Sequence, residues 1–158
     1  MNRLFATLVL LTLAVPALAV PGRASSRIRN YRDRFEVVVG GPAGMVLDSL
    51  AAEAARAGFT QVSRDDVKLR MRWEKAATPE EVEPVANWTY EDTERRRFQF
   101  EIAQAKKPAG AFTIMAVTSL VANPDAIDEK EKDLGKLQPW RDEMKAILAR
   151  VQAAFPAK

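Results

Sequence analysis

Carboxylates are the groups with the most chemical potential in this sequence, because the chain has no histidine and no cysteine. Without imidazole or thiol groups it lacks the usual general base at neutral pH, the Ser-His-Asp and Cys-His nucleophile systems, and every zinc site built from those ligands. No serine has a lysine three residues further on, which excludes a Ser-x-x-Lys dyad. Enzymatic chemistry is therefore restricted to carboxylate pairs, or to a lysine or tyrosine in a perturbed site.

Two acidic groups are dense enough to suggest glycosidase chemistry or calcium binding. The first comprises Glu80, Glu81, Glu83, Glu91, Asp92 and Glu94, and the second comprises Asp125, Asp128, Glu129, Glu131 and Asp133. The first group lacks an apolar pocket that would separate the pKa values of its members, and the second lacks the calcium-loop pattern with its central glycine. We therefore expect both groups to form solvated surface, and the sequence predicts no metal site and no cofactor.

A basic sheet face is the main candidate binding surface. Residues 67–74 alternate strictly between apolar and charged side chains, which predicts a strand with one buried and one solvent-exposed face. The exposed face would carry Lys68, Arg70 and Arg72, and Arg97 begins the polar face of a neighbouring candidate strand. Such a face suits phospholipid headgroups, lipopolysaccharide phosphates or an acidic partner. Alternatively it is an ordinary solvated face whose charge is balanced by nearby glutamates.

Trp88 and Tyr90 are aromatic residues that fit no apolar stripe. Trp73 and Trp140, in contrast, lie on apolar stripes and are predicted to belong to the core. Trp88 and Tyr90 lie in the acidic segment between two candidate strands. We therefore expect this pair to contact a ligand or a partner.

The elements that position these residues follow from hydrophobic periodicity. Residues 34–39 include a β-branched run typical of a buried strand, and residues 47–57 carry a helical apolar stripe that ends at Gly58. Further strands are predicted at residues 59–62, 67–74, 97–102 and 112–117. The last of these is apolar on nearly both faces, which predicts a central strand.

The chain ends in a predicted amphipathic helix preceded by Pro139. Its apolar stripe comprises Trp140, Met144, Ile147, Leu148, Val151 and Phe155. Residues 78–81 are typical of a helix start, residues 63–66 are predicted to form a turn, and residues 123–135 are predicted to form a short solvated helix. The order β-α-β-β-β-β-α predicts a two-layer α+β sandwich, an antiparallel sheet of about four to five strands with two amphipathic helices on one face.

Residues 1–19 have the pattern of a secretory signal peptide: an arginine near the start, an apolar run, and an Ala-Leu-Ala ending. The apolar run is too short to span a membrane, so we expect cleavage after about Ala19 and no transmembrane segment. Residues 20–33 mix proline, glycine, serine and arginine, which predicts a basic flexible lead to a single domain at residues 34–156. The expected location is a bacterial periplasm or the outside of the cell.

Export and the missing residue types together predict a small non-catalytic binding or interaction protein. Its expected partner is an envelope protein or an anionic lipid or glycan surface. Nucleic acid is disfavoured by export and by a formal net charge of only +3. Two alternatives stay open: a carboxylate-based hydrolase of envelope glycan, and a structural accessory subunit whose exposed strand edge pairs with a partner.

Overall fold

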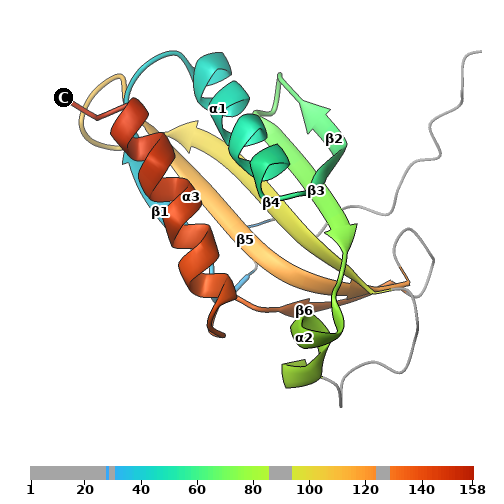
Figure 1. Cartoon of the computed structure of the whole chain (residues 1–158). Helices are drawn as coiled ribbons and strands as arrows, with labels where there is room; N and C mark the ends of the chain where they lie inside the picture. Colours follow the sequence, from blue (N-terminus) through green and yellow to red (C-terminus); the bar gives the residue numbers. More distant parts are fainter. Residues whose placement is uncertain (1–27, 29–30, 86–93, 124–128) are drawn as a thin grey trace, which may run out of the picture.

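The computed structural model describes residues 28, 31–85, 94–123 and 129–158. The elements are β1 (Phe35–Val39), α1 (Ala43–Arg56), β2 (Thr60–Asp65), β3 (Arg70–Ala76), α2 (Pro79–Val82), a 3-10 turn (Glu83–Val85), β4 (Arg95–Gln104), β5 (Phe112–Ala122), β6 (Lys130–Asp133) and α3 (Trp140–Ala154). Figure 1 shows α1 and α3 lying against one side of the strands. The predicted α+β class with an antiparallel sheet is confirmed.

The described strands form one antiparallel sheet in the order β1-β5-β4-β3-β2, with β6 also paired to β5. β1 and β6 follow one another along the same edge of β5: Val37 lies opposite Ile114, and Lys132 lies opposite Leu120. β4 pairs with the other edge of β5. β5 therefore has neighbours on both sides, as the apolar character of its two faces predicted.

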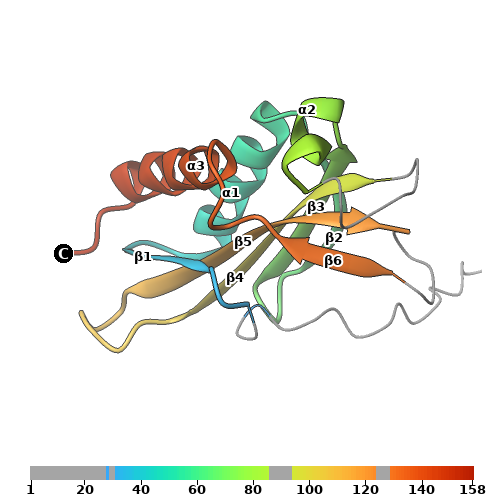
Figure 2. The same ribbon diagram turned by 90° about the horizontal axis from the view of Figure 1, so that it is seen from below.

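The main core lies between the sheet and the helices α1 and α3, which cover one of its faces (Figure 2). The side chains that α3 buries are Trp140, Met144, Ile147, Leu148 and Val151. These are the predicted stripe residues apart from Phe155, which follows the last residue of α3 and is partly buried against the core, and the amphipathic helix is confirmed. In α1, Leu47 and Leu50 are fully buried on the face that meets the sheet.

A Schellman-type cap ends α1. Gly58 has a φ of 84°, in the left-handed region that glycine adopts readily. Its N–H donates to the carbonyl oxygen of Ala55 at 3.0 Å, and the N–H of Phe59 donates to that of Ala54 at 3.1 Å. The cap leads the chain straight into β2 and places Phe59 in the core, where its ring stacks on Phe98 with centroids 3.8 Å apart.

The opposite face of the sheet is partly covered by the segment before β1. Ile28 is buried against Met115 and Val117 of β5, and Tyr31 packs beside them. These two residues fall within the lead predicted at 20–33, so part of that lead contributes side chains to the domain. Residues 20–27 and 29–30, like the predicted signal peptide at 1–19, lie outside the described residues.

The hairpin of β2 and β3 turns later than predicted. The prediction of a turn at residues 63–66 is wrong, because β2 continues to Asp65 and the turn occupies residues 66–69. Val67, which the alternation placed in the core, is 93% exposed. The Asp65 carboxylate places the turn there, because its Oδ1 atom accepts hydrogen bonds from the N–H groups of Val67 and Lys68 at 3.1 and 2.9 Å. An aspartate that bonds the backbone ahead of it favours a turn over a continuing strand.

Two predictions concern the segments around the acidic groups. The helix start at residues 78–81 is confirmed: α2 begins at Pro79, and the N–H of Thr78 donates to Glu81 Oε2 at 2.9 Å. The helix predicted at residues 123–135 is wrong for the part of that range that the structure describes after residue 128, because Lys130–Asp133 form β6 instead. Lysines alternate with acids in this segment, and that period of two suits a strand whose acids face one way.

Candidate functional site

The structure divides the predicted basic face into exposed and buried parts. Lys68 lies in the turn after β2 and not on the strand, with its side chain 67% exposed. Arg70 and Arg72 lie on the face of β3 that points away from the helices, with 44% and 21% of their side chains exposed. Arg97 lies on the same face of β4, but it is only 2% exposed. The prediction that all four cations share one solvent-exposed face is therefore wrong.

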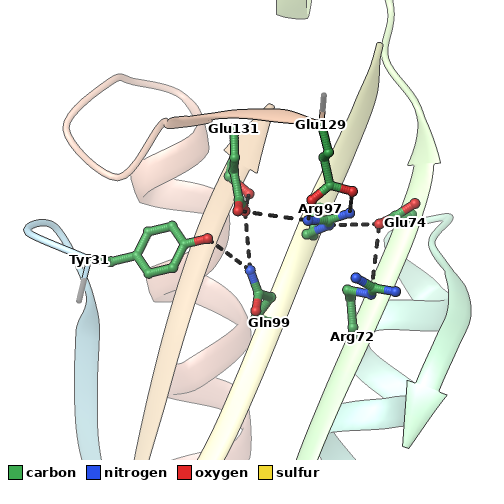
Figure 3. A network of polar contacts seen from close by, with 8 residues as sticks. Tyr31, Arg72, Glu74, Arg97, Gln99, Glu129 and Glu131 are labelled. Atoms are coloured by element: carbon green, nitrogen blue, oxygen red, sulfur yellow. Dashed lines mark hydrogen bonds and ion pairs between the residues drawn. The ribbon is translucent and has the colours of Figure 1, made fainter. Parts of the chain in front are cut away.

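Carboxylates surround the buried guanidinium of Arg97 (Figure 3). Its Nε donates to Glu74 Oε1 at 2.7 Å, and its two Nη atoms donate to the two oxygens of Glu129 at 2.8 and 3.0 Å. Glu131 Oε2 lies 3.7 Å from Nη1. Burial lowers the pKa of Arg97, but the hydrogen bonds to Glu129 and the charges of Glu74 and Glu131 outweigh it and raise the pKa above its ordinary value.

Glu131 extends this network to β5 and to the segment before β1. It accepts hydrogen bonds from the hydroxyl of Ser119 and from Nε2 of Gln99, the latter at 3.1 Å. The same Gln99 nitrogen donates to the hydroxyl of Tyr31 at 3.0 Å (Figure 3). Glu129 and Glu131 belong to the acidic group predicted to be solvated surface, and that prediction is wrong for both. Since Arg97 is buried, it must be paired, and these acids supply the charge.

The other exposed cations also have acidic neighbours. Arg70 Nε lies 3.1 Å from Glu101 Oε2, and Arg72 Nε lies 4.0 Å from Glu74 Oε1. Glu74 and Glu101 are themselves buried. The face is therefore a self-neutralised layer of side chains rather than a cationic platform.

A second buried arginine was missed by the sequence analysis. Arg96 is fully buried on the helix side of β4. It donates to Glu81 of α2 at 2.7 Å, and to Glu143 of α3 and the hydroxyl of Thr118 at 2.9 Å each. Its guanidinium carbon also lies 5.7 Å from the ring centroid of Trp140. The run of three arginines at 95–97 could have indicated it. Successive side chains on a strand point to opposite faces, so at least one arginine of this run must point toward the helices.

The first acidic group also contributes to this inner site. Glu81 pairs with Arg96 and with Lys75, whose Nζ lies 3.3 Å from Glu81 Oε1. Glu80 and Glu83 are exposed. Within the parts of the chain that the structure describes, no cluster of three or more histidine, cysteine, aspartate or glutamate residues could hold a metal ion. Trp88 and Tyr90, the predicted aromatic contact pair, lie outside the described residues.

The exposed large apolar side chains lie on β2, in the turn after it and on α1. Met45, Val62 and Val67 are 56%, 40% and 93% exposed, and they are the large hydrophobic residues that the described chain leaves exposed. Val62 lies at a bulge in β2, between residues 61 and 63 in the pairing with β3. Bulges redirect side chains at sheet edges. Arg64 ties β2 to α1, because its Nη1 lies 2.8 Å from Asp48 Oδ1. We name these residues the β2 edge: Met45, Asp48, Val62, Arg64 and Val67.

The opposite edge of the sheet is more thoroughly covered. Gln152 of α3 donates from Nε2 to the carbonyl oxygen of Val38 in β1, at 3.1 Å. The N–H of Gly40, just after β1, donates to the carbonyl oxygen of Phe155 at 2.9 Å. Lys130 and Lys132 of β6 are exposed there, and edge lysines discourage pairing with another strand. An extended segment could therefore reach the backbone of β2 more readily than that of β1 or β6.

The β2–β3 turn predicts a measurable pH dependence. The backbone N–H of Lys68, together with that of Val67, lowers the pKa of Asp65 below its ordinary value of 3.8. A group with a lowered pKa stabilises the fold above its ordinary pKa, and this contribution is lost as the pH falls through the folded value. We expect NMR titration to place the Asp65 carboxyl below 3.8. We also expect Asp65→Asn to reduce the acid sensitivity of urea unfolding. An ordinary pKa at Asp65 would contradict this account.

No protein-family model matches the sequence, and no curated protein matches it. Among the described residues, no helix is both long and apolar enough to cross a membrane.

Proposed function

We propose that this chain is a small exported, non-catalytic interaction protein that binds a protein partner through the β2 edge. One observation carries the proposal: β2 ends the sheet, and the exposed large hydrophobic side chains of the described chain lie on it, in the turn after it or on the helix bound to it. An edge strand presents unpaired backbone N–H and C=O groups, and an extended partner segment can add a strand there.

A protein partner fits this geometry better than an anionic lipid or glycan surface. An anionic surface would have to compete with Glu101 for Arg70 and with Glu74 for Arg72, and Arg97 is buried among three carboxylates. An external anion that replaced these carboxylates would break as many ion pairs as it formed, whereas exposed apolar side chains gain free energy when a partner covers them. The β2 edge thus offers binding without breaking existing ion pairs.

Export is the sequence-based part of this proposal. The pattern of residues 1–19 supports a signal peptide cleaved after about Ala19, and hence a location in a bacterial periplasm or outside the cell. The lack of histidine and cysteine supports a binding role over a hydrolytic one. The partner would then be another envelope or extracellular protein.

Site-specific photo-cross-linking in the exporting cell tests the proposal. We would place a photoreactive amino acid at Val62 or Val67 in the full chain, and at Ala149, an exposed residue of α3, as the control. The expected result is a discrete protein adduct from the first two positions and none from Ala149. No adduct at Val62 and Val67, or an equal yield at Ala149, would refute a partner at the β2 edge.

A charged side chain introduced at the β2 edge gives a second measure of partner binding. Val62→Lys should weaken capture of the cross-linked partner by about tenfold or more, because it adds a desolvation cost at the point of contact. Ala149→Lys is the matched control and should leave capture unchanged. Both substituted side chains are exposed, so we expect stability changes within about 0.5 kcal/mol.

A further inference from the structure

β6 is held to the sheet without an apolar side chain of its own. Its sequence is Lys130-Glu131-Lys132-Asp133, with both lysines exposed, and β5 is its partner in the described sheet. β1 lies along the same edge of β5 but buries Val39 completely in the main core. Burial of apolar surface is the main source of strand stability, so β6 depends on its backbone pairing and its carboxylates.

Those carboxylates define the site that β6 occupies. Glu129 and Glu131 are two residues apart, so in an extended chain both point to the same side. Glu129 binds Arg97 through both of its oxygens, and Glu131 accepts from Gln99 and Ser119 (Figure 3). In chemical terms, an extended acidic segment is bound to a strand edge beside a buried guanidinium.

We propose that this edge is a binding site for extended acidic segments, with β6 as its built-in, releasable occupant. Release of β6 would expose the backbone of Ser119–Ala122 and leave Arg97 with Glu74 as its remaining partner among the carboxylates described above. A partner strand with acidic side chains two residues apart would then satisfy both the backbone and the guanidinium. Bidentate arginine–carboxylate pairing and strand addition together specify this ligand class.

The extent of the release is set by the residue that follows β6. Leu134 is fully buried, and its N–H donates to the carbonyl oxygen of Thr118 at 3.0 Å. The chain is therefore anchored from Leu134 onward, and the releasable part is confined to residues 129–133. This site lies at the β5 edge, away from β2 in the strand order, so the inference does not depend on the function proposed above.

A reversible lock provides the test. Ala122 and Lys130 are paired across β5 and β6, and the chain has no native cysteine. Full-length Ala122→Cys/Lys130→Cys protein would be locked when oxidised and free to open when reduced. The probe is a fluorescent peptide with the sequence of residues 129–133, Glu-Lys-Glu-Lys-Asp, and its control has glutamine in place of both glutamates. Peptide is used at about millimolar concentration, because a tethered occupant competes at that effective concentration.

We expect the reduced protein to bind the acidic peptide at least tenfold more tightly than the oxidised protein, and neither form to bind the glutamine peptide. Hydrogen exchange on the unmodified chain gives an independent measure, in which β6 amides should exchange at least tenfold faster than β1 amides. Equal binding in both redox forms, no binding to the reduced form, or β6 protection equal to that of β1 would each overturn the proposal.

Discussion

Replacing Arg97 with methionine is expected to lower the free energy of unfolding by about 3–5 kcal/mol. The change removes a cation that lies within 4 Å of Glu74, Glu129 and Glu131 alike. Glu74 has only 2% of its side chain exposed, so its charge cannot be transferred to water without disturbing the sheet. An uncompensated buried charge accounts for most of the expected loss.

Urea unfolding of Arg97→Met checks this, with Arg95→Met as the matched control. Arg95 lies two residues earlier on the same strand face but is exposed, so its loss should cost no more than about 0.5 kcal/mol. Adding Glu74→Gln to Arg97→Met should recover part of the loss, because it removes one of the stranded charges. Equal stability of Arg97→Met and Arg95→Met would contradict the buried network.

Replacing Arg96 with methionine is expected to cost a similar amount, about 3–5 kcal/mol, through the inner site. Arg96 joins three elements, since it donates to Glu81 of α2, Thr118 of β5 and Glu143 of α3. Its guanidinium also lies over the rings of Phe98 and Trp140, within 6 Å of each centroid. Arg96→Lys should recover only part of the loss, because an ammonium group cannot reproduce this planar set of contacts.

Hydrogen exchange distinguishes the two arginines. Loss of Arg96 should increase exchange in α2 and in the first turn of α3, whereas loss of Arg97 should increase exchange in β6. Urea unfolding measures the global cost in both cases. Uniform loosening of the whole sheet by either variant would argue against separate inner and outer networks.

Much of the fold could be predicted because hydrophobic periodicity is a property of neighbouring residues. The stripe from Trp140 to Val151 is buried as expected, and β5 lies between two strands as its apolar faces suggested. The hairpin turn was placed too early, because the Asp65 carboxylate bonds the backbone of residues 67 and 68 and ends the alternation there. A side chain that competes for backbone groups can overrule a short hydrophobic pattern.

The candidate sites were harder to predict, because the state of a charged residue depends on partners far away in the chain. Arg96 and Arg97 are adjacent, yet one is paired with Glu143, 47 residues later, and the other with Glu129, 32 residues later. Nothing in the local pattern around Glu129 or Glu131 distinguishes an acid in water from one that neutralises a buried arginine. The prediction of a cationic face was wrong at Arg97 for this reason, whereas the alternative of a face balanced by nearby glutamates fits Arg70 and Arg72.

The sequence by itself determined which chemistry this protein lacks, since a chain without histidine and cysteine cannot use imidazole or thiolate groups. It also determined the α+β class and the apolar faces of the two long helices, because helical stripes report burial locally. Only the tertiary structure decided which arginines are buried, which acids bind them, and that β2 forms the open edge of the sheet. Strand order and ion pairing are non-local, and they arise only when distant segments are brought together by the burial of the core.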